Sequence, residues 1–113
     1  MEQLDVIDKK IEAPIGKVTF LTLEGSVNSY TYSDFQDKLY SLVENTHTCI
    51  DMSKVVNLSS AGLGVLMSAM ETAEENGFRL YIMNPSNVVD LAINSTGFRE
   101  MFLIIDSPDQ MRE

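Results

Sequence analysis

The chain has 113 residues, of which 44% are hydrophobic and 22% charged, and its formal net charge is −9. This length fits one globular domain, so we expect residues 1–113 to form a single domain around one core. The negative charge argues against nucleic acid and anionic membrane surfaces as partners.

The composition also indicates where the protein works. The first ten residues, MEQLDVIDKK, are too polar for a secretory signal, and no apolar run approaches the roughly 20 residues that span a bilayer. Cys49 is the one cysteine, which excludes an internal disulfide, and its apolar surroundings are typical of a core residue. We therefore expect a cytoplasmic protein.

Two strands and a helix are predicted first. Residues 3–12 suggest a weak edge strand, and residues 17–24 alternate apolar and polar side chains as a half-buried strand does. A helix is expected from Ser33, which has the capping-box spacing to Gln36. Its apolar face is formed by residues 35, 39, 42 and 43.

The middle of the chain predicts a buried strand and a second helix. Residues 47–52 form the strand, and a loop is expected to run through Asn57. The helix covers residues 60–76 and ends at Gly77, which tolerates a positive φ.

The last third predicts two strands around a third helix. The strands cover residues 78–84 and 101–105. Asn84 and Pro85 are typical of an N-cap and a first helical position. The helix is expected to reach about residue 96, with Val88, Leu91 and Ala92 facing inward, and Ser107-Pro108 to start a last helical turn.

This order of elements predicts the fold class. Strands that alternate with helices imply right-handed crossovers and a largely parallel sheet. We expect an α/β domain with a mixed, mostly parallel sheet of four to five strands and three to four helices, in which the first strand is an antiparallel edge.

Residues 51–65 carry the chemistry. They place Ser59 and Ser60 at a helix N-terminus on the carboxyl edge of the sheet, where α/β proteins bind ligands. A phosphate suits such a helix end and would add roughly −1.5 to −2 charges. From the residues alone, a plain capping role for either serine, with Gly62 and Gly64 serving packing, remains an open alternative.

The same segment resembles the signature of the STAS family. Asp51-Met52-Ser53 matches its strand end, and residues 60–64, Ser-Ala-Gly-Leu-Gly, match its helix start in place and spacing. Gly25, Gly77, Pro85 and Gly97-Phe98 also recur where the family has them. The resemblance covers nearly the whole chain and is closest to bacterial anti-sigma factor antagonists.

The resemblance implies a phosphorylation switch without a cofactor or a metal. Ser60 would be the phosphoacceptor, with Ser59 as a secondary candidate. The partners would be an anti-sigma factor that is also a serine kinase of the histidine-kinase-like ATPase type, and a serine phosphatase. The implied contact residues are Asn28, Tyr30, Asn57, Ser59, Ser60, Ala61, Gly62 and Leu63.

Two positions depart from the family pattern. Ser59 stands where an Asp usually precedes the phosphoacceptor, and Asn28 replaces an acid after the second strand. Both changes remove negative charge near the hydroxyl. This eases repulsion of a phosphate but also takes away a carboxylate that would help to orient the serine.

No catalytic motif is present, so we do not expect an enzyme. The chain lacks a G-x-S-x-G elbow and a Walker A lysine, and His47, the one histidine, is best explained as a strand-start residue. The alternative function is a STAS adaptor or regulatory subunit that is not phosphorylated, in a signalling or transport complex.

Overall fold

The computed structural model describes residues 4–112, which form one five-stranded sheet, three α-helices and two short 3₁₀ helices (η). The elements in chain order are β1 (Leu4–Ala13), β2 (Gly16–Val27), α1 (Tyr32–Val43), β3 (His47–Leu58), α2 (Ser60–Glu75), β4 (Leu80–Met83), α3 (Asn87–Ser95), η1 (Arg99–Met101), β5 (Leu103–Ile105) and η2 (Pro108–Gln110).

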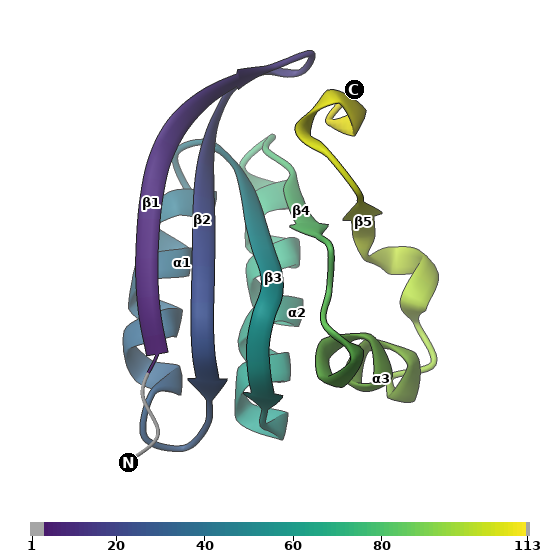
Figure 1. Ribbon diagram of the computed structural model, residues 1–113. Coiled ribbons are helices and arrows are strands. Elements are labelled where there is room, and N and C mark those ends of the chain that lie inside the picture. The colour runs from purple at the N-terminus through teal and green to yellow at the C-terminus, as the bar shows by residue number, and fades with distance from the viewer. Residues whose placement is uncertain (1–3, 113) are drawn as a thin grey trace.

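The strands follow one another across the sheet in the order β1-β2-β3-β4-β5 (Figure 1). β1 pairs with β2 antiparallel, and the other three pairings are parallel. The predicted α/β fold, the mostly parallel sheet and the antiparallel edge strand are therefore confirmed.

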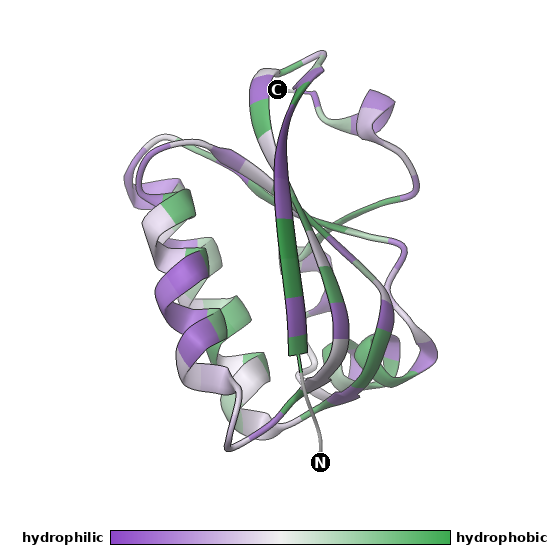
Figure 2. Cartoon of the chain, turned by 60° about the vertical axis from the view of Figure 1, so that its left-hand side comes forward, coloured by the Kyte–Doolittle hydropathy of each residue, from purple (hydrophilic) through white to green (hydrophobic). Residues whose placement is uncertain are grey.

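The main core lies between the sheet and the helices. The helices turn their hydrophobic sides toward the sheet, as Figure 2 shows for α1 and α2. Burial of apolar surface contributes about 25 cal/mol per Å², so this layer supplies most of the stability. Its fully buried helical residues include Phe35 and Leu39 of α1, Leu66 of α2, and Val89 and Ile93 of α3.

The opposite face of the sheet has a smaller core that the C-terminal segment covers. Met111 is fully buried there with Phe20, Cys49 and Tyr81. The Ile15 N–H donates to the Met111 carbonyl at 2.8 Å, and the Tyr81 hydroxyl donates to the Arg112 carbonyl at 3.0 Å. The helical turn predicted at Ser107-Pro108 is confirmed as η2.

β3 is twice as long as the strand predicted for residues 47–52. It continues to Leu58 because β2 also continues, to Val27, and the two strands stay paired through two register shifts. Exposed polar residues at positions 53, 54 and 57 give this stretch the polarity of a loop. The predicted loop through Asn57 is therefore wrong, and α2 follows the strand almost directly.

The predicted capping box of α1 is also wrong. The helix begins at Tyr32, and its N-cap, Thr31, makes no side-chain cap bond. Asn28 orders the turn instead, because its Oδ1 accepts the N–H groups of Tyr30 (2.8 Å) and Thr31 (3.2 Å).

α3 begins later than predicted, which rotates its buried face. Ser86, not Asn84, is the N-cap, and Asn84 has a positive φ of 49°. The inward residues are therefore Val89 and Ile93, whereas the side chain of Leu91, expected inside, is 68% exposed. Val88 is 38% exposed and Ala92 is half-buried.

Both late strands are shorter than expected. β4 covers residues 80–83 rather than 78–84, and β5 covers 103–105 rather than 101–105, because residues 99–101 form η1.

Candidate functional site

The site begins where β3 passes into α2 at the carboxyl edge of the sheet. Ser59 is the N-cap of α2, and its extended backbone donates an N–H to the Val27 carbonyl at 2.8 Å. The Ser59 hydroxyl oxygen accepts the N–H of Gly62 at 3.1 Å. One residue thus ties the helix start to β2 and satisfies a free helical N–H.

Ser60 is the first residue of α2 and is exposed. Within residues 4–112 its hydroxyl has no hydrogen-bond partner, whereas the Ser59 hydroxyl is used in the cap. The geometry therefore separates the two serines, because Ser60 is the one with a side chain free to react or to meet another surface.

Gly62 sets how closely α2 approaches the sheet. A Cβ on this residue would lie 2.5 Å from Val27 Cγ1 and 2.9 Å from Leu58 Cδ1. Gly62 is buried, so its role in the site is to bring the helix start against β2 and β3. A Cβ on Gly64 would meet nothing within 4 Å.

The loop after β2 presents an aromatic ring beside this edge. Asn28 is only 7% exposed, and its hydrogen bonds hold the turn that carries Tyr30. The Tyr30 side chain is 87% exposed. Asn28 therefore shapes the loop from inside, and Tyr30 presents its side chain to solvent.

The other predicted site residues lie around the start of α2. Asn57 and Ala61 are exposed and Leu63 is half-buried. The structure adds Val56, which the prediction did not single out and which is 67% exposed on β3. The sequence pair Val55-Val56 could have predicted this exposure, because side chains alternate along a strand and one of two adjacent valines then faces outward.

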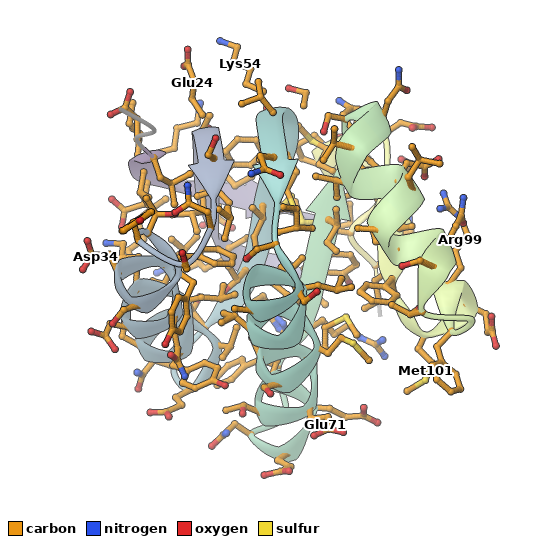
Figure 3. All side chains as sticks on the ribbon, turned by 90° about the horizontal axis from the view of Figure 1, so that it is seen from below. Glu24, Asp34, Lys54, Glu71, Arg99 and Met101 are labelled. Carbon is orange, nitrogen blue, oxygen red and sulfur yellow. The ribbon has the colours of Figure 1, made fainter. Side chains whose placement is uncertain are left out.

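The charge around Ser60 is low. The first turn of α2 contains no acidic residue, and its N–H groups carry the positive end of the helix dipole. Glu24 and Lys54 are neighbours in the β2–β3 register, and Figure 3 shows both side chains extending together, away from the helix layer. A phosphate on Ser60 would therefore add negative charge to a helix start that carries no acid of its own.

The cysteine and the histidine serve the fold. Burial, with a smaller contribution from nearby Asp51, raises the pKa of the Cys49 thiol to about 12. His47 begins β3, as predicted, and its Nδ1 accepts the Arg79 N–H at 3.1 Å. In the part of the chain that the structure describes, no group of three or more His, Cys, Asp or Glu side chains could hold a metal ion.

Among residues 4–112, no helix is long and apolar enough to span a bilayer.

The family model of the STAS domain matches residues 9–111. The chain therefore belongs to the STAS domain family, as its motif suggested.

Solved structures share the fold. An anti-sigma factor antagonist from Mycobacterium paratuberculosis is 20% identical, with a TM-score of 0.72 over 93% of this chain and 87% of that one. The anti-sigma factor antagonist SpoIIAA in its unphosphorylated form is 16% identical, with a TM-score of 0.67 over 95% and 88%. The Bacillus cell fate determinant SpoIIAA in its phosphorylated form is 16% identical, with a TM-score of 0.64 over 95% of this chain and 91% of that one.

Proposed function

We propose that this chain is an anti-sigma factor antagonist that binds a kinase-type anti-sigma factor through the carboxyl edge of its sheet and is released by phosphorylation of Ser60. The observation that carries the proposal is the exposed Ser60 hydroxyl at the first position of α2, beside a neighbouring serine whose hydroxyl is engaged in the helix cap. The similar structures support it by analogy, since they include an anti-sigma factor antagonist and SpoIIAA in its phosphorylated form.

The surroundings of Ser60 explain how a phosphate would act. Tyr30 is exposed on the loop after β2, and the first turn of α2 is free of acids. A phosphate would bring roughly −1.5 to −2 charges into the proposed contact surface. A partner that buries the surface would have to desolvate that charge, so the modified protein should bind more weakly.

The departures at Ser59 and Asn28 assign the chemistry to the partner. Proton removal from the serine hydroxyl is commonly assisted by a carboxylate in phosphoryl transfer. The first turn of α2 offers none. We therefore expect the kinase to bind the ATP and to supply the general base, while this chain contributes only the Ser60 hydroxyl. The reaction would take place in the cytoplasm. A serine phosphatase would reset the switch.

Intact-protein mass spectrometry tests the switch. The chain is incubated with ATP, Mg²⁺ and kinase-type anti-sigma factors from its own cells. We expect one added phosphate that maps to Ser60, disappears in Ser60→Ala and persists in Ser59→Ala. A phosphate that persists in Ser60→Ala would overturn the assignment.

A binding measurement with the same partner tests the consequence. Ser60→Ala should bind as the unmodified chain does, and Ser60→Asp should bind at least tenfold more weakly, since unfavourable charge at an interface costs several kcal/mol. Equal affinity of the two variants would contradict the switch.

The second candidate is a STAS adaptor that binds its partner constitutively. The replacement of two acids by Ser59 and Asn28 favours it. It predicts a stable complex and no phosphate in the presence of an active kinase.

A further inference from the structure

A groove lies at the end of the domain opposite to Ser60. It encloses about 400 Å³ and lies between the C-terminal half of α2, the start of β4 and the η1–β5 segment. Its lining is formed by Met70, Glu74, Gly77, Phe78, Arg79, Leu80, Met101 and Leu103. Because α2 has 16 residues and rises about 1.5 Å per residue, roughly 24 Å separate its two ends.

Apolar side chains reach solvent at this groove. Met101, which lines the groove, is 59% exposed. Met70, Phe78 and Leu103 are half-buried. Methionine side chains are flexible and polarizable, which suits surfaces that receive the apolar face of another helix.

Carboxylates border the groove on α2. Glu71, Glu74 and Glu75 are exposed and together line a second shallow hollow. Figure 3 shows Glu71 and Met101 on the same, helix-layer side of the domain, one on α2 and the other beyond it. Among the described residues that line the groove, Arg79 is the one cation. Arg99, nearby in sequence, pairs with Asp90 at 2.6 Å.

These three glutamates lie near the C-terminal end of α2, where the helix dipole favours positive charge. The last turn of α2 contains no basic residue, although the C-terminal end of the helix dipole is negative and is stabilised by cations. The free protein therefore carries unfavourable electrostatics at this end, which a cationic partner would relieve.

The charge also decides between two kinds of occupant. Glu71, Glu74 and Glu75 form an acidic rim of the groove. A second copy of this chain would bring another net charge of −9 to this rim. A segment with leucine-like residues on one face and Lys or Arg beside them would fill the apolar floor and neutralise the rim.

We propose that the groove between α2, β4 and the η1–β5 segment docks a basic amphipathic helix of a second protein, independently of the Ser60 surface. The chain would then hold two partners at opposite ends of α2, one reversibly through Ser60 and one through the groove. The proposal does not depend on the proposed function, because its test involves neither Ser60 nor ATP.

The test uses a synthetic peptide and methionine-methyl NMR on the whole chain. The probe is a peptide of about 18 residues, long enough to form a helix, built only of Leu and Lys with leucines at positions i, i+3, i+4 and i+7. We expect saturable shifts of the Met70 and Met101 methyl signals and none of those of Met52 and Met83, which lie in the core. The Ser60→Asp variant should bind the peptide equally well.

Charge variants sharpen the test. Neutralising the three rim acids, Glu71, Glu74 and Glu75, should weaken binding about tenfold, since each exposed ion pair contributes modestly. Neutralising three acids on α1 and at its C-cap should not change it. The rim variant is Glu71→Gln, Glu74→Gln and Glu75→Gln, and the matched control is Asp34→Asn, Asp37→Asn and Glu44→Gln.

Four results would overturn the proposal. They are the absence of saturable shifts, equal shifts with a scrambled peptide of the same composition, equal weakening in the α1 control, and a Met101 signal that moves with protein concentration alone. The last would show that a second copy covers the groove.

Discussion

The two ends of α2 differ in packing and in charge. At the N-terminal end, Gly62 touches β2 and β3 so closely that no Cβ fits, and the first turn carries no acid. At the C-terminal end the helix borders an open groove, and three glutamates occupy its last turns. We therefore expect the tight, acid-free end to respond to one added phosphate, and the open, acidic end to favour a partner that brings its own cations.

The largest expected effect breaks the tight packing. Gly62→Ala places a methyl group 2.5 Å from Val27 Cγ1, and Val27 is fully buried and has few rotamers to yield. Overpacking of this kind costs about 1–3 kcal/mol. Urea denaturation should show the loss as a lower midpoint.

Gly64 is the matched control on the same helix. A Cβ there meets nothing within 4 Å, so Gly64→Ala should stabilise the protein by about 0.5–1 kcal/mol through helix propensity. If the two variants had equal stability, the contact between α2 and β2 would not be as close as described.

The second effect concerns affinity rather than stability. Tyr30 is 87% exposed, so Tyr30→Ala should leave the unfolding midpoint unchanged. An exposed tyrosine that becomes buried at an interface typically contributes about 1–2 kcal/mol, roughly 5- to 30-fold in Kd. Calorimetry with the kinase-type partner measures it.

Leu91 provides the control for Tyr30. It is 68% exposed on α3 and is not among the proposed contact residues, so Leu91→Ala should leave the affinity unchanged. An equal loss from both variants would place the interface elsewhere.

The sequence predicted the architecture because the signals for it are local. Apolar periodicity and residues such as Gly77 located the strands and helices, and the order of elements then implied the parallel sheet. The errors occurred where tertiary pairing prevailed over local polarity. β3 extends to Leu58 because β2 pairs with it, and the capping of α3 moved to Ser86, whose hydroxyl donates to the Val55 carbonyl at 2.7 Å.

The sequence predicted that Ser59 and Ser60 lie at a helix start, but it left open which of the two hydroxyls caps the helix. Ser59 and Ser60 are adjacent and chemically identical in the sequence, and only the structure shows that the Ser59 hydroxyl accepts the N–H of Gly62. The groove was not predicted at all. Its residues come from α2, β4 and the η1–β5 segment, so nothing local marks Met70 and Met101 as belonging to one surface.

The third effect separates the two serines by stability. Ser59→Ala removes a side-chain cap and should cost about 1 kcal/mol, while Ser60→Ala should cost little because its hydroxyl makes no bond within residues 4–112. Thermal unfolding of the two variants compares them directly. A larger loss in Ser60→Ala would reverse the assignment of cap and free hydroxyl.

The smallest expected effect tests the acidic C-terminal end of α2. Glu75→Lys places a cation at the last residue of α2, where the dipole favours it, and should raise the stability by about 0.3–1 kcal/mol at low salt. The gain should shrink at high salt, because exposed charges are screened. Asp34 lies in the first turn of α1, where a negative charge is favourable, so Asp34→Lys should destabilise by a similar amount. If Glu75→Lys instead destabilised the protein, the acids would be contributing to the fold, and the argument that a cationic partner relieves them would lose its basis.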